Sequence, residues 1–335
     1  MDDSRPINTD IRLGLLCWNQ YTDWQSLLEV GQRADRLGFY SLWTWDHLYP
    51  IVGSDRGPFF EGYLTLAAWA QSTSRIRVGL MVGANPFRYP TLTAKMATTL
   101  DHISGGRAYL GIGSAWNDDE AKAFGIEFGE SPAERLRWLR ESLPIMRAML
   151  HGEEPSAEGP RYFADAVRND PPPVQAHLPI LIGGGGEKVT LRLVARYGDA
   201  NNIGFAAGLE TFKRKEAALR RHCEEVGRDQ SEIERTMNTG PIVIRDSTDD
   251  AVRELERIYE HNGGAQQWAG RAASEQPTGS PEHVVEVLLP FVEQGYRHLV
   301  IGSPSPYDVE TMERLVSEVQ PRLQAAVVAS PVGVA

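Results

Sequence analysis

The chain has 335 residues, of which 41% are hydrophobic and 24% charged, and this composition indicates a folded protein rather than a disordered one. The formal net charge of −11 is scattered along the chain, which argues against binding to the phosphate backbone of nucleic acid. No apolar run reaches the roughly 18 residues of a membrane span, and the acidic start MDDSRPINTD is unlike a signal peptide, so we expect a cytoplasmic protein. The two cysteines, Cys17 and Cys223, lie far apart without metal spacing, and no disulfide is predicted.

Eight short apolar runs, separated by amphipathic segments, predict the strands of a parallel sheet. They are IRLGLLC (11–17), SLWTWD (41–46), IRVGLMVG (76–83), AYLGIGS (108–114), PILIGG (179–184), ANNIGF (200–205), TGPIVI (239–244) and HLVIGS (298–303). A strand followed by a helix eight times predicts an α/β fold, a (β/α)8 TIM barrel with surface insertions. We expect one domain over residues 1–335, with the barrel at about 11–323, and functional groups just past the carboxyl ends of the strands.

Two stretches interrupt this alternation. Residues 151–178 are rich in proline and charge, including three consecutive prolines, and are interpreted as a surface insertion. Residues 263–281 lack periodicity and carry small residues around Trp268 and Arg271, which suits a mobile lid as well as an inert linker.

Two motifs directly follow predicted strands. The tract Gly183, Gly184, Gly185 and Gly186 ends one strand and opens the helix predicted at EKVTLRLVARYG, where backbone amides and the helix dipole would suit a phosphate. The alternative is a tight turn that needs positive φ. Asp46 and His47 in WTWDHLYP place a carboxylate and an imidazole side by side after the second strand. They suit acid–base chemistry or ligand binding, whereas a lone histidine is more often structural.

The segment ANPFRYP after the third strand would place Asn85, Arg88 and Tyr89 on the same functional rim, although Arg88 could equally form a salt bridge there. Other kinds of site find no support. GGGGEKVT is not a Walker A loop, and GIGSAW does not complete GxGxxG because Trp116 occupies the third glycine position. The eight histidines include no HxH or HExxH, and GxSxG is absent, so neither a metal site nor a nucleophile elbow is predicted.

Four segments of the sequence together resemble a known family. They are WTWDHLYP, the run from RIRVGLMVGANPFRYP through ISGGR to GIGSAWNDDEAKAFGI, PILIGGGGEKVTLRLVARYGDANN, and GSPEHVVEVLLPFVEQGYRHLVI. They resemble the luciferase-like monooxygenase superfamily, and within it the branch that uses the deazaflavin coenzyme F420, over residues 11–323. The resemblance implies a bacterial luciferase-like barrel that transfers a hydride between F420 and a small organic substrate, either an alcohol or carbonyl or an activated alkene or imine. Related enzymes are often dimers, so a homodimer is expected.

The resemblance also implies roles for individual residues. His47 would donate or accept the proton near the reacting carbon, and Asp46 would contact the cofactor or orient the imidazole. A bulge with a non-proline cis peptide would support the ring from behind, at Met81–Val82 or alternatively at Val82–Gly83. The cofactor-binding residues would then be Asp46, Met81, Val82, Gly83, Ala84, Ser114, Ala115 and Asn117 around the ring, with Gly183, Gly184, Gly185 and Gly186 at the phosphate.

The chain departs from the sugar-phosphate dehydrogenases of this branch at Trp116, where those relatives carry a glutamate that acts as a second acid, so their specific activity is not implied. Two alternatives to an F420 enzyme stay open. One is a luciferase-like monooxygenase that uses reduced FMN and oxygen, because FMN enzymes share the barrel and the glycine tract. The other is a flavin-binding protein of the same fold without catalytic activity. Aromatic residues such as Trp18, Trp43 and Trp116 could line an apolar pocket, but barrel cores use the same residue types.

Overall fold

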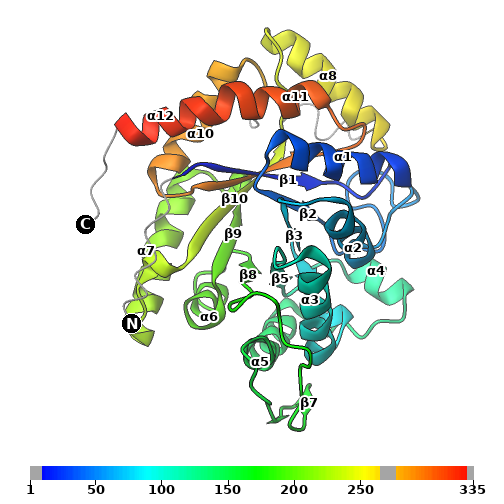
Figure 1. The fold of residues 1–335 in the computed structure, drawn as a ribbon, viewed down its shortest axis with the longest axis vertical. Coiled ribbons are helices and arrows are strands. Elements are labelled where there is room, and N and C mark those ends of the chain that lie inside the picture. The colour runs from blue at the N-terminus through cyan, green and yellow to red at the C-terminus, as the bar shows by residue number, and fades with distance from the viewer. Residues whose placement is uncertain (1–9, 265–276, 330–335) are drawn as a thin grey trace.

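The computed structural model describes residues 10–264 and 277–329, and a ring of parallel strands forms its centre (Figure 1). The strands are β1 (Arg12–Cys17), β2 (Ser41–Thr44), β3 (Arg77–Leu80), β4 (Gly83–Ala84), β5 (Leu110–Gly113), β8 (Ile180–Gly183), β9 (Ala200–Gly204), β10 (Glu234–Pro241) and β11 (His298–Ser303). They are hydrogen-bonded in the order β3-β2-β1-β11-β10-β9-β8-β5-β4. A parallel bridge between Val78 and Ala108 joins β3 to the segment ahead of β5 and closes the ring. Because β4 continues the line of β3, the predicted (β/α)8 barrel is confirmed.

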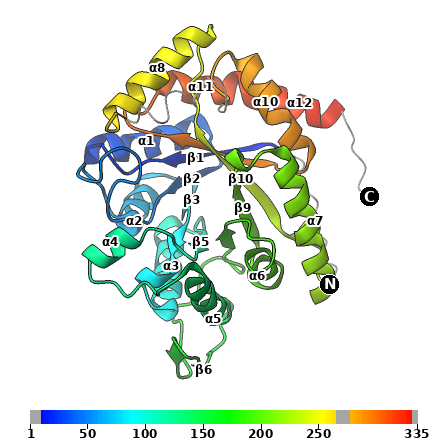
Figure 2. The same ribbon diagram turned by 180° about the vertical axis from the view of Figure 1, so that it is seen from behind.

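Helices surround this ring (Figure 2). They are α1 (Trp24–Leu37), α2 (Gly62–Ser72), α3 (Pro90–Ser104), α4 (Asp118–Ala123), α5 (Pro132–Leu150), α6 (Thr190–Tyr197), α7 (Leu209–Val226), α8 (Thr248–His261), α10 (Pro281–Glu293), α11 (Val309–Arg314) and α12 (Gln320–Ala329), the last two joined by a π-helical turn at Leu315–Val319. Helix α1 illustrates how the sequence determines these helices, because its apolar residues Leu27, Val30 and Ala34 are buried on one face. Its N-cap Asp23 accepts a hydrogen bond from the Ser26 amide, and its C-cap Gly38 adopts the left-handed conformation. Among the described residues no helix is long and apolar enough to cross a membrane.

Packed side chains fill the middle of the barrel. Trp43 is fully buried there among residues from the other strands, namely Leu16, Met81, Tyr109, Leu181, Ala200 and Val300. Two glycines make room for its indole. A Cβ on Gly79 would lie 2.6 Å from the Trp43 ring, and one on Gly14 would lie 3.2 Å from its Nε1. The interior at this level is therefore a core and not a channel.

A polar network fills the amino-terminal end of the barrel. Oε1 of Glu234 accepts from Arg12 at 2.9 Å and lies 3.1 Å from His298 Nδ1, while Oε2 accepts from the Tyr109 hydroxyl at 2.8 Å. Nε2 of His298 is 2.6 Å from Ser41 Oγ. Burial would raise the pKa of Glu234, but the charge and hydrogen bond of His298, helped by Arg12 and Tyr109, lower it to about 2. This end is thus occupied by a satisfied ionic cluster, opposite to the predicted functional end.

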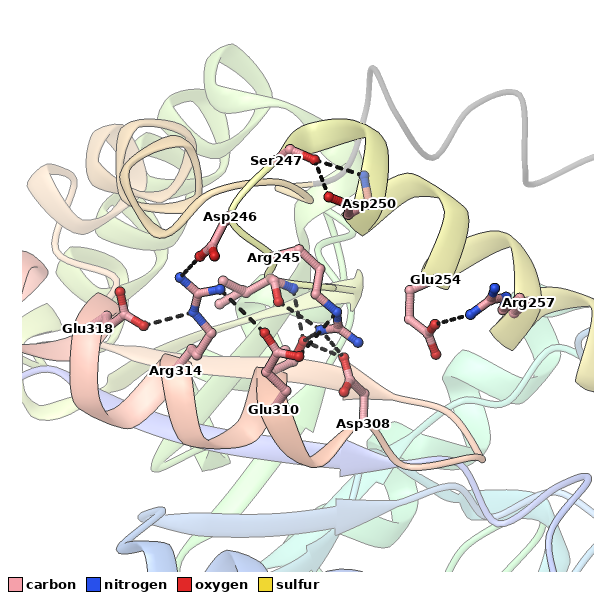
Figure 3. A network of polar contacts seen from close by, with 12 residues as sticks. Arg245, Asp246, Ser247, Asp250, Glu254, Arg257, Asp308, Glu310, Arg314 and Glu318 are labelled. Carbon is pink, nitrogen blue, oxygen red and sulfur yellow. Dashed lines mark hydrogen bonds and ion pairs between the residues drawn. The ribbon is translucent and has the colours of Figure 1, made fainter.

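Ion pairs join the segment between β10 and α8 to α11 and its N-cap residue Asp308, where the last two strands leave the barrel (Figure 3). Arg245 contacts Asp308 at 2.8 Å and Glu310 at 3.3 Å, and Arg314 contacts Asp246 at 2.8 Å. Arg314 also reaches Glu310 at 3.4 Å, so that carboxylate joins the two arginines. Charges that share partners in this way hold the connections after β10 and β11 in one arrangement.

Three features differ from the sequence predictions or extend them. The bounds predicted for the seventh strand, 239–244, are wrong, because β10 begins at Glu234 and pairs with both neighbours before the register shifts between Asn238 and Pro241. The insertion at 151–178 contains a small antiparallel hairpin, β6 (Ala157–Glu158) with β7 (Phe163–Ala164). Most of the possible lid at 263–281, with Trp268 and Arg271, lies outside the described residues.

Candidate active site

Asp46 lies just past the end of β2, and its carboxylate is held on both oxygens. Oδ2 accepts from the Ala84 amide at 2.7 Å and from Arg88 Nη1 at 2.7 Å, and Oδ1 accepts from Arg88 Nη2 at 2.9 Å. Such a bidentate pair is strong and directional. Burial lowers the pKa of Arg88, but the Asp46 carboxylate raises it above its usual range. Asp46 therefore ties the exit of the second strand to the exit of the third.

Arg88 has further partners besides Asp46. Its Nη2 lies 3.0 Å from Glu61 Oε1, and its guanidinium lies over the Tyr63 ring at 4.8 Å from the centroid. Of the other two residues predicted on this rim, Asn85 is buried and donates to the Tyr162 hydroxyl at 3.2 Å, whereas Tyr89 is exposed. The salt-bridge alternative for Arg88 is thus what the structure contains.

The imidazole of His47 pairs with a carboxylate that is distant in sequence. Its Nδ1 lies 2.6 Å from Oε1 of Glu120, which comes from α4 and has a side chain only 1% exposed. The second oxygen of Glu120 accepts from the amides of Leu48 at 2.7 Å and Tyr49 at 3.4 Å. Glu120 thus binds the ring and the backbone that follows it, and neighbouring Asp46 does not hold this nitrogen.

The other ring nitrogen of His47, Nε2, is unpaired within the part of the chain that the structure describes. Nε2 has no hydrogen-bond partner among the described residues and is not one of their buried unpaired atoms, so it is open to a ligand. The edge of the ring meets Trp116, with centroids 5.4 Å apart, and the Trp116 side chain is 61% exposed. The accessible side of His47 is therefore bordered by a large, exposed aromatic surface.

The third strand is interrupted at the residues predicted to support a cofactor ring. The Met81–Val82 peptide bond is cis, so the prediction for this bond is confirmed and the alternative at Val82–Gly83 is not needed. The Met81 side chain is buried in the barrel core, whereas Val82 lies across the ends of two neighbouring strands. A Cβ built on Gly113 would lie 2.8 Å from Val82 Cγ2, and one on Gly183 would lie 2.7 Å from it. Only glycine at both strand ends leaves room for this valine.

The exit of β5 has an unusual backbone. Ser114 and Ala115 follow the strand, and Ala115 has φ of 63°, which costs a residue with a Cβ on the order of 1 kcal/mol. Asn117 then precedes α4 without a side-chain capping bond. This turn directs Trp116 toward His47 and starts the helix that carries Glu120.

The glycine tract leaves β8 as an open loop. Gly184 has φ of 104°, and its amide donates to the Asn202 carbonyl at 3.0 Å. The helix predicted directly after the tract is wrong in its start, because α6 begins at Thr190 and a turn at 187–189 intervenes. The amide of Leu191 donates back to the Gly186 carbonyl at 3.0 Å, which joins the loop to the helix.

The donor set at this loop fits a phosphate. The amides of Gly185 and Gly186 have no acceptor among the described residues, and the ammonium of Lys215 reaches the Gly185 carbonyl. The nearby Glu187 carboxylate is already paired with Arg214 at 2.7 Å. Free amides beside a cation are what an anionic group requires. A planar ring, in turn, would find a wall in Val82 between its two glycines, so the residues present suit both parts of a flavin-type cofactor.

Four of the predicted residues, Asp46, Val82, Ala84 and Gly183, are linked by contacts at one end of the barrel. Asp46 contacts Ala84, which pairs in register with Gly113, and Val82 spans Gly113 and Gly183. Two residues of this region were not predicted from the sequence, Glu120 and Lys215. Glu120 lies in the acidic stretch NDDEAKA, where three neighbouring acids gave no sign of which one is buried, and Lys215 lies in an ordinary amphipathic helix.

A barrel of eight strand positions with its candidate ligand groups at the carboxyl end belongs to the (β/α)8 class of proteins. The model of the luciferase-like monooxygenase family matches residues 12–316, and the chain therefore belongs to that family.

Known proteins of this kind resemble the chain over nearly its whole length. It is 26% identical over 321 residues to the F420-dependent glucose-6-phosphate dehydrogenase of Amycolatopsis mediterranei, covering 90% of this chain and 95% of that protein. A solved F420-dependent secondary alcohol dehydrogenase, in complex with an F420–acetone adduct, superposes with a TM-score of 0.79 at 22% identity, covering 94% of this chain and 99% of that one. The FMN-bound oxygenating constituent of 3,6-diketocamphane monooxygenase from Pseudomonas putida superposes with a TM-score of 0.69 at 20% identity, covering 93% and 99%. The two structural likenesses concern the fold.

Proposed function

We propose that the protein is an F420-dependent oxidoreductase that transfers a hydride between the deazaflavin and a small organic substrate, with His47 as the proton donor or acceptor. The observation that carries this proposal is that Nε2 of His47 has no partner in residues 10–264 and 277–329 and lies at the same barrel end as Val82 and the glycine tract. The full-length similarity to enzymes named as F420-dependent dehydrogenases supports F420 over FMN. An alcohol or carbonyl is the first substrate class to test.

Each part of the site has a task in this proposal. When bound, the deazaflavin supplies two-electron chemistry as hydride acceptor or donor. The free amides of Gly185 and Gly186, with Lys215, would hold its phosphate, and Val82 would support its ring. When an alcohol is oxidised, Nε2 of His47 would take the hydroxyl proton as the hydride leaves carbon, and it would return a proton to oxygen in the reverse reaction. Asp46 would keep the strand exits in place through Ala84 and Arg88.

Glucose 6-phosphate is not the substrate we propose. Trp116 borders His47, and its indole carries no carboxyl group that could act as a second acid there. An apolar group beside the reacting carbon would instead gain contact with its exposed face. We also expect a homodimer, which light scattering of the purified protein measures directly.

The test of the cofactor is a side-by-side titration of the purified protein with F420 and FMN, followed by tryptophan quenching. Tighter binding of F420 supports the proposal. A preference for FMN would replace it with a flavin monooxygenase, and tight F420 binding without turnover of any alcohol or carbonyl in a panel would favour a non-catalytic binding protein.

The test of the proton role is the His47→Ala variant. Loss of a general acid or base typically costs 10²- to 10⁴-fold in rate, and we expect turnover to fall by that amount while F420 still binds. His102→Ala is the control, because His102 is exposed on α3 and its ring nitrogen Nε2 is hydrogen-bonded to the Pro172 carbonyl, away from the candidate site. Near-normal turnover by the His47 variant would remove this role.

A further inference from the structure

Glu120 is a buried carboxylate, and both of its oxygens have hydrogen-bond partners. Both of its oxygens are used: Oε1 faces Nδ1 of His47 at 2.6 Å, and Oε2 faces the amides of Leu48 and Tyr49 at 2.7 and 3.4 Å. A backbone N–H can only donate, and the oxygens of an ionised carboxylate can only accept. Nδ1 of His47 must therefore carry the proton of this bond.

We propose that Glu120 is a positioning residue that holds His47 as the Nδ1–H tautomer and so presents Nε2 at the mouth of the barrel as a proton acceptor. In a neutral imidazole one nitrogen is a donor and the other an acceptor, so a proton fixed at Nδ1 leaves the lone pair on Nε2. The use made of that lone pair depends on the function proposed above, but the tautomer itself does not.

The surroundings of Glu120 keep the carboxylate in place. It projects from α4, whose next residue, Ala121, is fully buried and whose first residue, Asp118, forms an ion pair with Arg135 at 3.1 Å. Neighbouring Asp46 does not compete for the ring, because both of its oxygens have other partners. A single rigid acceptor thus determines the orientation of the imidazole as well as its tautomer.

An amide at this position would have the opposite effect. Glutamine has nearly the same size but offers one accepting oxygen and one donating NH2 group. The amides of Leu48 and Tyr49 cannot turn away, so the oxygen would stay with them and the NH2 group would face His47 Nδ1. Nδ1 would then have to accept, and the proton would move to Nε2. The Glu120→Gln variant should therefore invert the tautomer with little change in packing.

The experiment is nitrogen NMR of the full-length protein labelled with 15N-histidine, in the absence of any cofactor. Long-range proton–nitrogen correlations distinguish a protonated from an unprotonated ring nitrogen, and His47→Gln identifies the His47 signals among the eight histidines. We expect Nδ1–H in the unchanged protein, Nε2–H in Glu120→Gln, and the unchanged pattern in Asp119→Asn. Asp119 is a matched control, because it is the exposed acid next to Glu120 in the same helix.

Several results would overturn the proposal. An Nε2–H signal for His47 in the unchanged protein would contradict it. This result needs no variant, so the proposal can be tested even if Glu120→Gln does not fold. Retention of the Nδ1–H signal in a folded Glu120→Gln protein would also contradict it. If turnover with F420 is established, Glu120→Gln should lower kcat by about 10²- to 10⁴-fold with little change in KM, as when the carboxylate of another His pair is replaced by an amide. Failure of the F420 titration alone would leave the tautomer result intact.

Discussion

A single methyl group added at Gly183 should disturb the wall that Val82 forms. A Cβ at this position would lie 2.7 Å from Val82 Cγ2 and 2.9 Å from Cγ1, whereas ordinary contacts begin at 3.4 Å. The valine would have to move by roughly 0.7 Å, and overpacking of this kind typically costs about 1–3 kcal/mol of unfolding free energy. Gly183 does not have a positive φ, so the expected cost of Gly183→Ala comes from the contact and not from the backbone.

Two further variants isolate this contact. Gly204→Ala is the control, because Gly204 also ends a strand but its added Cβ would meet only Asn238 Oδ1, at 3.7 Å. We expect its free energy of unfolding to change by no more than about 0.5 kcal/mol. Val82→Ala removes both methyl groups that clash, so the double variant Gly183→Ala/Val82→Ala should recover 1 kcal/mol or more relative to additive behaviour.

Urea unfolding and an F420 titration measure the two consequences. The free energy of unfolding should be lower for Gly183→Ala than for Gly204→Ala. Under the proposed function, F420 should bind Gly183→Ala at least about tenfold more weakly than it binds the unchanged protein, which corresponds to about 1.4 kcal/mol. Equal stability of Gly183→Ala and Gly204→Ala, or strict additivity with Val82→Ala, would refute the packing argument. If Gly183→Ala is destabilised but binds F420 with normal affinity, Val82 does not form part of the surface that binds the cofactor.

Two predictions concern stability alone. Because the pKa of Glu234 is lowered from 4.5 to about 2 in the folded protein, its ion pairs stabilise the fold above about pH 4.5, and this contribution is lost as the pH falls toward 2. Glu234→Gln should therefore lower the free energy of unfolding at pH 7 by at most roughly 3 kcal/mol. It should also reduce the change of this free energy between pH 4.5 and 2, which urea unfolding at several pH values measures. The same pH dependence in the variant and the unchanged protein would contradict the role of Glu234. Ala115→Gly should raise the free energy of unfolding by about 0.5–1 kcal/mol, because glycine accepts φ of 63° without strain, and a destabilised variant would show that the turn needs the methyl group.

The barrel could be predicted from the sequence because most of its strands are apolar on both faces, and this pattern is visible in each short segment. The bounds of β10 were predicted wrongly because this strand does not follow the pattern. Glu234 belongs to the polar network at the amino-terminal end, so the strand begins with a charged residue, while the apolar run Ile242, Val243 and Ile244 that was taken for the strand packs beyond its end. Where inward-facing residues are ionic, an apolar run is a poor guide to strand bounds.

Residues of the candidate site could be predicted only where their residue type and their position at the end of a strand indicated a role. Asp46, His47 and the glycine tract stand at strand ends and could be found from the sequence, and the cis bond after Met81 followed from the family resemblance. The partner of His47 could not, because Glu120 is 73 residues away and becomes its neighbour only when α4 docks against the loop after β2. Likewise nothing in the local sequence indicated that Glu120 is buried while the adjacent Asp119 is exposed.

The connection after β5 carries two different determinants within five consecutive residues. Trp116 borders the open side of the imidazole, and Glu120 binds its closed side. Under the functions proposed here, exchange of this one short connection would change both the substrate that contacts Trp116 and the protonation of His47 that Glu120 determines. The strands and the glycine tract would stay unchanged. The divergence of activities on this scaffold can therefore proceed through one exchangeable segment, and chimaeras made at this connection are the natural place to look for altered selectivity.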